Sequence, residues 1–291
     1  MSRPDVLMAG DALTETAFAK INLALHVRGR RDDGYHSLES LFVFAADGDR
    51  LHAVLDHHLR LKVEGPFAQG LETDADNLVL RAAIALRDFA EVREGARLVL
   101  DKRLPVASGI GGGSADAAAT LRLLIRLWGL DVDEADLLHL ALSLGSDVPA
   151  CLASRTQFVG GRGEELREVE IAGLRGKAML LVNPRAPLST GKVFARWDGV
   201  DRGALEPGDM TALVEQGRND LEPAAIALAP VIADVLTALR AQPGVQLVRM
   251  SGSGATCFAL FADAAARNRA RYAVQAAQPG WWVMATEIGD R

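Results

Sequence analysis

Residues 105–118 read Pro-Val-Ala-Ser-Gly-Ile-Gly-Gly-Gly-Ser-Ala-Asp-Ala-Ala, with glycine at positions 109, 111, 112 and 113. In the preceding stretch, residues 97–104, leucines alternate with other side chains as they do in a strand, and Pro105 ends that pattern. After Ser114, apolar residues recur at helical spacing up to Trp128, and Gly129 is a suitable helix stop. The sequence therefore predicts a strand, a glycine loop and a helix, in that order.

A glycine loop between a strand and a helix is typical of a phosphate-binding site. Glycine lacks Cβ, so backbone N–H groups can approach a ligand closely, and the start of a helix adds unpaired donors and a partial positive charge. Two familiar nucleotide loops do not fit, because no Gly-Lys-Ser/Thr closes the loop and Gly109-x-Gly111-x-x-Ser114 lacks the third glycine of a dinucleotide fingerprint. The alternative is a plain tight turn, for which one or two glycines suffice.

The composition is that of a globular protein long enough for two domains. The 291 residues are 49% hydrophobic, and the formal net charge of −6 argues against a nucleic-acid-binding surface. Only five of the 32 basic residues are lysine, so there is no polybasic segment for a membrane. Cys151 and Cys257 lie far apart without zinc-ligand spacing, which is typical of a reducing compartment. We expect a cytoplasmic protein whose partners include neither nucleic acid nor a membrane.

The first part of the chain has the pattern of strands followed by helices. A turn at Asp47-Gly48-Asp49 is predicted between the second strand and the third. The helix that Asp76 or Asn77 caps should turn its apolar residues, Val79, Ala83, Leu86 and Phe89, inward. The strands are predicted at residues 17–27, 38–45, 51–55 and 59–63.

A hairpin over residues 158–169 leads to the second part of the chain, and we place a domain boundary at about residue 165. This boundary gives domains of residues 1–165 and 166–291. The second part reads as strand, helix, an alanine-rich helix broken at Pro230, strand-loop-strand, helix and strand, with a second glycine loop, Ser251-Gly252-Ser253-Gly254. One layer of helices on an antiparallel or mixed sheet is an α+β fold.

Two polar residues have unusual positions. Lys20 lies in the middle of a strand of small and apolar residues, with Asn22 on the same face, and Asp147 follows Gly145, which ends a helix that begins after Asp133. A lysine could stabilise charge on a transferring phosphoryl group, and a carboxylate could accept a proton from a hydroxyl nucleophile. The alternatives are a solvated lysine on an edge strand and an ordinary helix N-cap. Spacing alone does not place the two side by side.

Two further segments have the chemistry of a ligand site. Tyr35 and His36, which follow the Asp33-Gly34 turn, could stack on and hydrogen-bond to a flat heteroaromatic group, or they could be turn residues packed on the core. The loop at Ser251 could approach the same ligand across a domain cleft, where ligand sites are common, or it could be a plain hairpin turn.

Together, three separated stretches resemble the three motifs of the GHMP small-molecule kinases, in the same order. They are Ala19-Lys20-Ile21-Asn22-Leu23, residues 105–118, and Ser251-Gly252-Ser253-Gly254-Ala255. The stretches Arg31-x-Asp33-Gly34-Tyr35-His36-x-Leu38 and Gly145-Ser146-Asp147-Val148-Pro149 are similar to the branch that acts on a cytidine-diphosphate-linked methylerythritol in non-mevalonate isoprenoid biosynthesis. The resemblance spans about residues 15–261.

This resemblance implies a two-domain GHMP kinase fold, with an N-terminal domain like domain 2 of ribosomal protein S5 and a ferredoxin-like C-terminal domain. It implies transfer of the γ-phosphate of ATP to the 2-hydroxyl of the cytidine-linked methylerythritol, giving ADP and the 2-phosphate. Mg²⁺ is expected with ATP, bridging phosphates and not held in a protein cage; its protein ligands are not assigned. We expect a monomer or a weak homodimer.

The resemblance also implies roles for individual residues. Asp147 would be the general base and Lys20 its charge-stabilising partner. Asn22 would lie near the substrate, with Tyr35 and His36 at the cytosine and Phe194 on the opposite face of the base. Ser114 would contact Mg²⁺ or a phosphate. The ATP phosphates would be wrapped by Pro105, Val106, Ala107, Ser108, Gly109, Ile110, Gly111, Gly112, Gly113, Ser114 and Ala115.

Two other functions of the same fold stay open. A GHMP kinase could act on another small alcohol, such as homoserine or mevalonate, and a non-catalytic sensor could bind ligand only. The Asp33 to His36 segment favours the cytidine substrate, since a small alcohol does not need it. The presence of both Lys20 and Asp147 speaks against a sensor. Relatives often carry more glycine where this chain has Val106-Ala107-Ser108, which leaves the nucleotide contacts there less defined.

Overall fold

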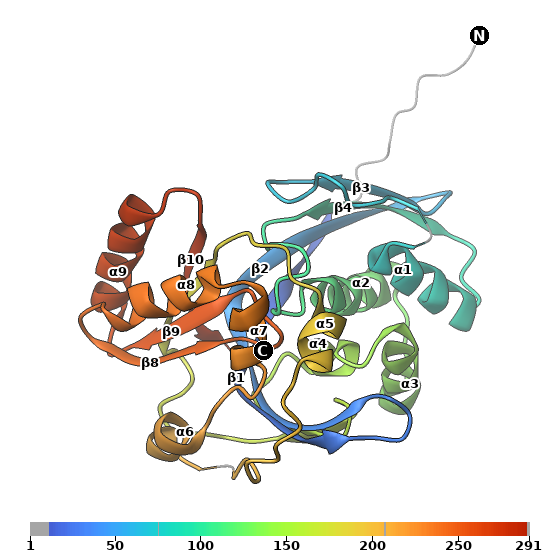
Figure 1. The fold of residues 1–291 in the computed structure, drawn as a ribbon. Helices are drawn as coiled ribbons and strands as arrows, with labels where there is room; N and C mark the ends of the chain where they lie inside the picture. Colours follow the sequence, from blue (N-terminus) through green and yellow to red (C-terminus); the bar gives the residue numbers. More distant parts are fainter. Residues whose placement is uncertain (1–11, 75, 207, 290–291) are drawn as a thin grey trace.

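The first half of the protein is a curved sheet with helices on one face (Figure 1). The computed structural model describes residues 12–74, 76–206 and 208–289, so the first eleven and last two residues of the predicted domains lie outside it. Its strands are β1 (Leu13–Arg30), β2 (His36–Asp56), β3 (Arg60–Glu64), β4 (Gly95–Asp101), β5 (Gln157–Gly160) and β6 (Glu165–Glu168). Its helices are α1 (Leu78–Phe89), α2 (Gly112–Trp128), α3 (Glu134–Leu144) and α4 (Val148–Ala153).

Helix α2 is the centre of this half, because it packs on β1 and β2 and is flanked by α1 and α4. Its N-cap is Gly111 and its C-cap is Gly129, both with a φ of 63°. The predicted stop at Gly129 is confirmed, and the helix begins two residues earlier than Ser114, so that Gly112 and Gly113 form its first turn. The backbone N–H groups of that turn are therefore free for a ligand.

The predicted turn at Asp47-Gly48-Asp49 is wrong, because β2 runs through it without a break. Gly48 pairs with Phe18 of β1, and a Cβ at Gly48 would lie 1.8 Å from the carbonyl oxygen of Ala17. Asp49 is buried, and its Oδ1 accepts hydrogen bonds from the backbone N of Arg103 and Leu104. Gly48 thus allows the close contact between β1 and β2, and Asp49 supplies a buried carboxylate.

Helix α1 follows its predicted pattern except at one end. Asn77, and not Asp76, is the N-cap, and its Oδ1 accepts a hydrogen bond from the N of Val79 at 2.9 Å. The inward prediction for Phe89 is wrong, since this last residue of the helix is 48% exposed. The other predicted core residues of the helix are buried: Val79, Ala83 and Leu86.

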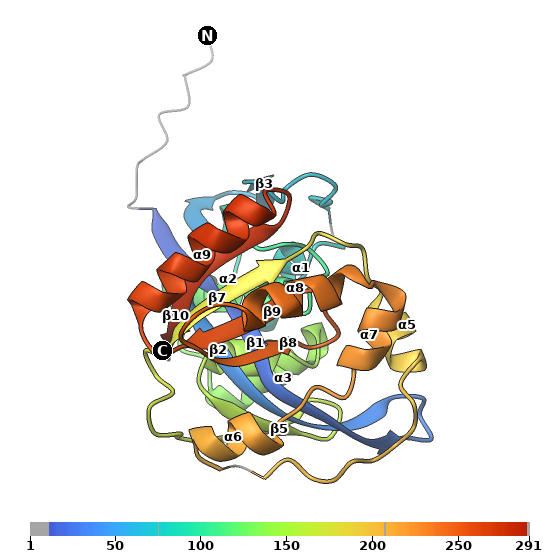
Figure 2. The same ribbon diagram turned by 60° about the vertical axis from the view of Figure 1, so that its left-hand side comes forward.

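The second half is a smaller antiparallel sheet with α8 and α9 on one face (Figure 2). The predicted break at Pro230 is confirmed and separates α7 from α8. Its strands are β7 (Ala178–Asn183), β8 (Val245–Met250), β9 (Cys257–Phe261) and β10 (Trp282–Gly289). Its helices are α5 (Thr190–Ala195), α6 (Met210–Gln216), α7 (Glu222–Leu228), α8 (Val231–Arg240) and α9 (Ala264–Ala277).

The C-terminal strand β10 joins the two halves. It pairs with β7 along six residues, and its end pairs with β2 at Ile288 opposite Ala45. Thr286 of β10 also donates a hydrogen bond to Asp47 Oδ2 at 2.7 Å. Among the described residues the main path of the sheet is β3-β4-β2-β10-β7-β9-β8. The predicted α+β fold is confirmed.

The domain boundary at residue 165 stays a prediction. Strand β6, which begins at that residue, pairs with β5, and β5 pairs with β2. A boundary after β6 would keep this hairpin with the first half. No helix among the described ranges is long and apolar enough to cross a bilayer.

Candidate active site

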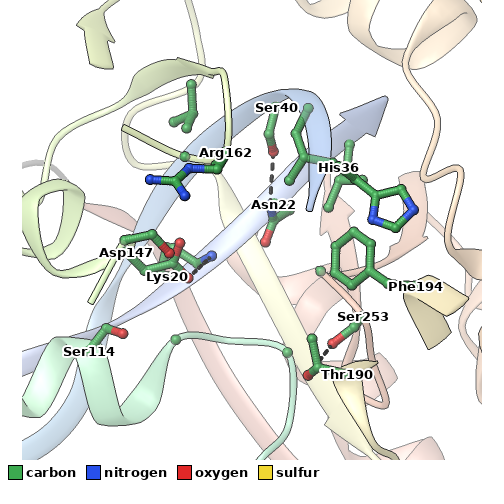
Figure 3. Close-up of a pocket in the computed structure, with 18 of the residues that line it drawn as sticks. Lys20, Asn22, His36, Ser40, Ser114, Asp147, Arg162, Thr190, Phe194 and Ser253 are labelled. Carbon is green, nitrogen blue, oxygen red and sulfur yellow. Dashed lines mark hydrogen bonds and ion pairs between the residues drawn. The ribbon is translucent and has the colours of Figure 1, made fainter. Parts of the chain in front are cut away.

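A cavity of about 650 Å³ opens where the two halves meet. Figure 3 shows its walls: Lys20 and Asn22 come from β1, and Asp147 and Ser114 lie at the starts of two helices. His36 of β2 and Phe194 of α5 line another part of it. Residues that are far apart in the sequence therefore meet in one cavity.

Lys20 and Asp147 form an ion pair in this cavity, with 2.8 Å between Lys20 Nζ and Asp147 Oδ2. The Lys20 side chain is 6% exposed and that of Asp147 is 32% exposed, so the lysine is buried behind its partner. Lys20 Nζ also lies 4.0 Å from the ring centre of Phe42. Asp147 is the N-cap residue of α4, yet its side chain makes no capping hydrogen bond. Lys20 is therefore not a solvated lysine on an edge strand, and Asp147 is not an ordinary helix N-cap.

The first glycine loop forms the wall next to this pair. Lys20 N donates a hydrogen bond to Ile110 O at 3.0 Å, and a Cβ at Gly111 would lie 3.1 Å from the Lys20 side chain. Ile110 and Ala115 are buried and do not line the main cavity. Pro105 and Val106 line a second cavity of about 350 Å³. The residues on the main cavity are Ala107, Ser108, Gly109, Gly111, Gly112, Gly113 and Ser114.

The second glycine loop lies directly against the first. Ser251 Oγ donates a hydrogen bond to Gly109 O at 3.0 Å, and the N of Thr256 donates one to Ser108 O at 3.1 Å. Gly109 has a φ of 78°, and a Cβ there would lie 2.5 Å from Ser251 O, so only glycine fits. Gly252 and Ser253 line the main cavity. The loop therefore approaches the site across the cleft, and it is more than a hairpin turn.

Aromatic side chains line the part of the cavity around β2 and α5. The ring of His36 lies 5.1 Å from that of Phe194 and 5.6 Å from that of Trp197. Burial and the charge of Arg30 hold the pKa of His36 below its usual value, so its ring is neutral at neutral pH, with one nitrogen a donor and the other an acceptor. Tyr35 also lines the cavity but is 61% exposed.

Arg162 is a cavity residue that the sequence interpretation missed. Its guanidinium lies 5.2 Å from the ring centre of Tyr35 and 3.8 Å from Asp33 Oδ2. It comes from the turn between β5 and β6, where the only sequence signal was an arginine among three glycines. Figure 3 shows it on the same side of the cavity as Asp147. The site thus has a positive charge beyond Lys20.

A buried charge cluster beneath the first glycine loop was also missed. Lys102 Nζ donates hydrogen bonds to Asp49 Oδ2 and Asp116 Oδ2, both at 2.5 Å. Burial, with the nearby Asp49 charge, raises the pKa of Asp116 to about 7. When Asp116 is protonated, it adds no negative charge beneath an anion bound on the loop above. No local pattern connects these three residues, which lie on β2, after β4 and on α2.

Asp116→Asn should change how stability depends on pH. A carboxyl whose folded-state pKa lies above its unfolded value of about 3.9 stabilises the fold at low pH, and that stability is lost as pH rises toward 7. The variant lacks this loss, so its free energy of unfolding should rise relative to wild type between pH 5 and pH 8. Urea unfolding across this range measures the difference. Asp131→Asn, at an exposed position, is the control, and its free energy of unfolding should differ from wild type by the same amount at every pH. The same pH-independent difference for Asp116→Asn would contradict the raised pKa.

Comparison with known proteins identifies the family. The family model for the GHMP kinases N terminal domain matches residues 77–155, and that for GHMP kinases C terminal matches residues 203–280. The 4-diphosphocytidyl-2-C-methyl-D-erythritol kinase of Rhizorhabdus wittichii is 54% identical, over 94% of each chain. The chain belongs to the GHMP kinases. The enzyme of the same name from Sphingopyxis alaskensis is 51% identical to this GHMP kinase, over 94% of its chain and 97% of the relative.

Solved structures agree with this family. A crystal structure of 4-(cytidine 5'-diphospho)-2C-methyl-D-erythritol kinase matches this GHMP kinase with a TM-score of 0.80 and 34% identity, over 95% of this chain and all of the other. Homoserine kinase from Cytophaga hutchinsonii matches with a TM-score of 0.74 over 100% and 98% of the two chains, but its 19% identity shows the fold alone. The two-domain GHMP kinase fold expected from the sequence is confirmed.

Proposed function

We propose that this GHMP kinase transfers the γ-phosphate of ATP to the 2-hydroxyl of 4-diphosphocytidyl-2-C-methyl-D-erythritol, a step of non-mevalonate isoprenoid biosynthesis. The observation that carries the proposal is the Lys20–Asp147 pair, which faces the first glycine loop in a cavity that also contains His36 and Phe194. One cavity thus offers a proton acceptor, a phosphate loop and an aromatic surface for a nucleobase. Relatives of high identity over nearly the whole chain carry the name of this kinase.

In the proposed reaction, the substrate hydroxyl oxygen attacks the γ-phosphorus while the bond from that phosphorus to the oxygen bridging to the β-phosphate breaks. The hydroxyl proton would pass to Oδ1 of Asp147, because Lys20 donates its hydrogen bond to the other carboxylate oxygen, Oδ2. Lys20 holds the carboxylate in place and offers positive charge to the transferring phosphoryl group. ADP and the 2-phosphate are the products.

The phosphates of ATP would lie on the first glycine loop, at the start of α2. The second cavity shares Ala107, Gly112 and Gly113 with the main one, which gives room for the nucleotide's base next to the loop. No three His, Cys, Asp or Glu side chains in the described ranges gather as a metal site. Mg²⁺ would be held mainly by phosphate oxygens, and Ser114 would offer it a hydroxyl from the loop. Bound there, Mg²⁺ would neutralise charge on the β- and γ-phosphates.

The cytidine end of the substrate would bind among His36, Phe194 and Tyr35. Cytosine has both donor and acceptor groups, which a neutral His36 can match, and an aromatic ring such as Phe194 offers a stacking surface. A small alcohol such as homoserine or mevalonate has no aromatic base that could stack on this surface. The contact between Lys20 and Asp147 favours a kinase over a sensor.

We also propose that the protein acts in the cytoplasm as a monomer or a weak homodimer. Cys151 and Cys257 are buried and unpaired, which fits a reducing compartment.

The proposed function is tested by ADP release with Mg-ATP and three acceptors. We expect turnover with 4-diphosphocytidyl-methylerythritol. With mevalonate and homoserine, kcat/KM should be lower by a factor of at least about 100, because these acceptors have no nucleobase to bind the aromatic surface. Faster turnover of mevalonate or homoserine would show that the small alcohol, and not the cytidine compound, is the substrate. ATP binding without turnover of any acceptor would favour the sensor.

A further inference from the structure

Asn22 is held by two serines from different parts of the chain. Its Nδ2 lies 2.9 Å from Ser40 Oγ on β2, and its backbone N lies 3.0 Å from Ser251 Oγ in the second glycine loop. Both serines are buried, and Asn22 is 3% exposed. Asn22 and Ser40 both line the main cavity, and Figure 3 shows the bond between them. The Asn22 side chain therefore has a fixed place at the edge of the cavity.

The single proton of Ser40 determines which way the Asn22 amide points. Ser40 Oγ lies 2.6 Å from Ala24 O, and a carbonyl oxygen can only accept, so the hydroxyl donates there. Toward Asn22 the hydroxyl can then act only as an acceptor, and the atom that faces it must be the donor Nδ2 and not Oδ1. The oxygen of the amide consequently lies on the opposite side from Ser40, as Figure 3 shows.

Asn22 Oδ1 is a buried acceptor in need of a partner. No hydrogen-bond partner for it is found among the described residues. A Cβ at Gly252, which lines the cavity, would lie 3.3 Å from this oxygen. A buried polar atom left unpaired is unfavourable, and here a ligand in the cavity can supply the missing donor.

We propose that Ser40 is a positioning residue that locks the Asn22 amide with its oxygen toward the substrate. Asn22 then selects a hydrogen-bond donor, and the opposite amide orientation would instead select a phosphate oxygen. Asn22 and Lys20 share one face of β1, about 7 Å apart along the strand. The donor is therefore a hydroxyl of the methylerythritol unit, close to the phosphoryl acceptor; this identity of the substrate rests on the proposed function.

Ser40→Ala tests the proposal by kinetics. Without the hydroxyl the amide can rotate, so kcat/KM for 4-diphosphocytidyl-methylerythritol should fall about 10-fold while the KM for ATP stays the same. Ser40→Thr keeps the hydroxyl and should restore most of the loss. Adding Ser40→Ala to Asn22→Ala should cause no further loss, because the serine acts only through the amide.

Ser154→Ala is the matched control, since Ser154 is another buried serine whose hydroxyl donates to a carbonyl, that of Cys151, at 2.6 Å. It loses a similar hydrogen bond and should leave kcat/KM unchanged. Wild-type kcat/KM in Ser40→Ala would overturn the proposal. So would losses in Ser40→Ala and Asn22→Ala that multiply in the double variant.

A second measurement does not depend on turnover. The side-chain NH₂ signal of Asn22 in the NMR spectrum, assigned by its absence in Asn22→Ala, should exchange slowly with solvent in wild type and rapidly in Ser40→Ala. If wild type does not phosphorylate the cytidine compound but this exchange behaves as expected, the proposed function fails and the role of Ser40 stands. Equal exchange rates in the two proteins would refute the role of Ser40, whatever the substrate.

Discussion

Asp147→Asn should lower kcat about 1,000-fold, a barrier increase of about 4 kcal/mol. The amide has the shape of the carboxylate but cannot accept the hydroxyl proton, and it leaves the buried Lys20 without its 2.8 Å counter-charge. ATP contacts the glycine loop and not this side chain in the proposed complex, so ATP affinity should change little. Single-turnover phosphoryl transfer and calorimetric ATP binding measure the two effects separately.

Asp133→Asn is a matched control for this prediction. Asp133 is the exposed N-cap residue of α3, and its side chain, like that of Asp147, makes no capping hydrogen bond. The control should keep wild-type kcat. If Asp147→Asn kept kcat within about 10-fold of wild type, a loss too small for a missing general base, Asp147 would not be the base.

Gly48→Ala should lower the free energy of unfolding by about 3 kcal/mol or more. The added methyl group would lie 1.8 Å from Ala17 O and 2.9 Å from the Cα of Phe18, both backbone atoms that no side-chain rotation can move. The strands β1 and β2 would have to separate at this point, where the neighbouring Asp49 receives the bonds of the charge cluster. Urea denaturation with an unchanged m-value would measure the loss.

Gly29→Ala gives the comparison, because Gly29 also lies in β1 but nothing is within 4 Å of its Cβ position. This variant should lose no more than about 0.5 kcal/mol. Equal stability of the Gly48 and Gly29 variants would show that β2 bends at residue 48, as the Asp-Gly-Asp composition had predicted.

Local patterns predicted the parts of the fold that depend on nearby residues. The caps Asn77 and Gly129, the break at Pro230 and the glycine loop all follow from chemistry within a few positions. The turn at Gly48 failed because its signal is local, while its structure depends on Ala17, which comes close only when β1 and β2 pair. Tertiary contact overrode turn propensity there.

The candidate site divides in the same way. Lys20 and Asp147 were singled out by their unusual positions, but 127 residues separate them, and only the packing of α4 beside β1 brings them together. Lys102 and Arg162 had no such signal, because charged residues at strand ends and in turns are common. Asp49 and Asp116 meet Lys102 only when β2, β4 and α2 pack together. Ser40 could not be found either, since its role depends on the direction of one hydroxyl proton.

Strand β10 ties the two half-sheets into one. Its eight residues lie between β2 and β7 in the sheet and pair with both. Without β10, strand β7 would have an open edge that can pair with other chains. The strand that joins the two halves therefore also protects β7 from aggregation.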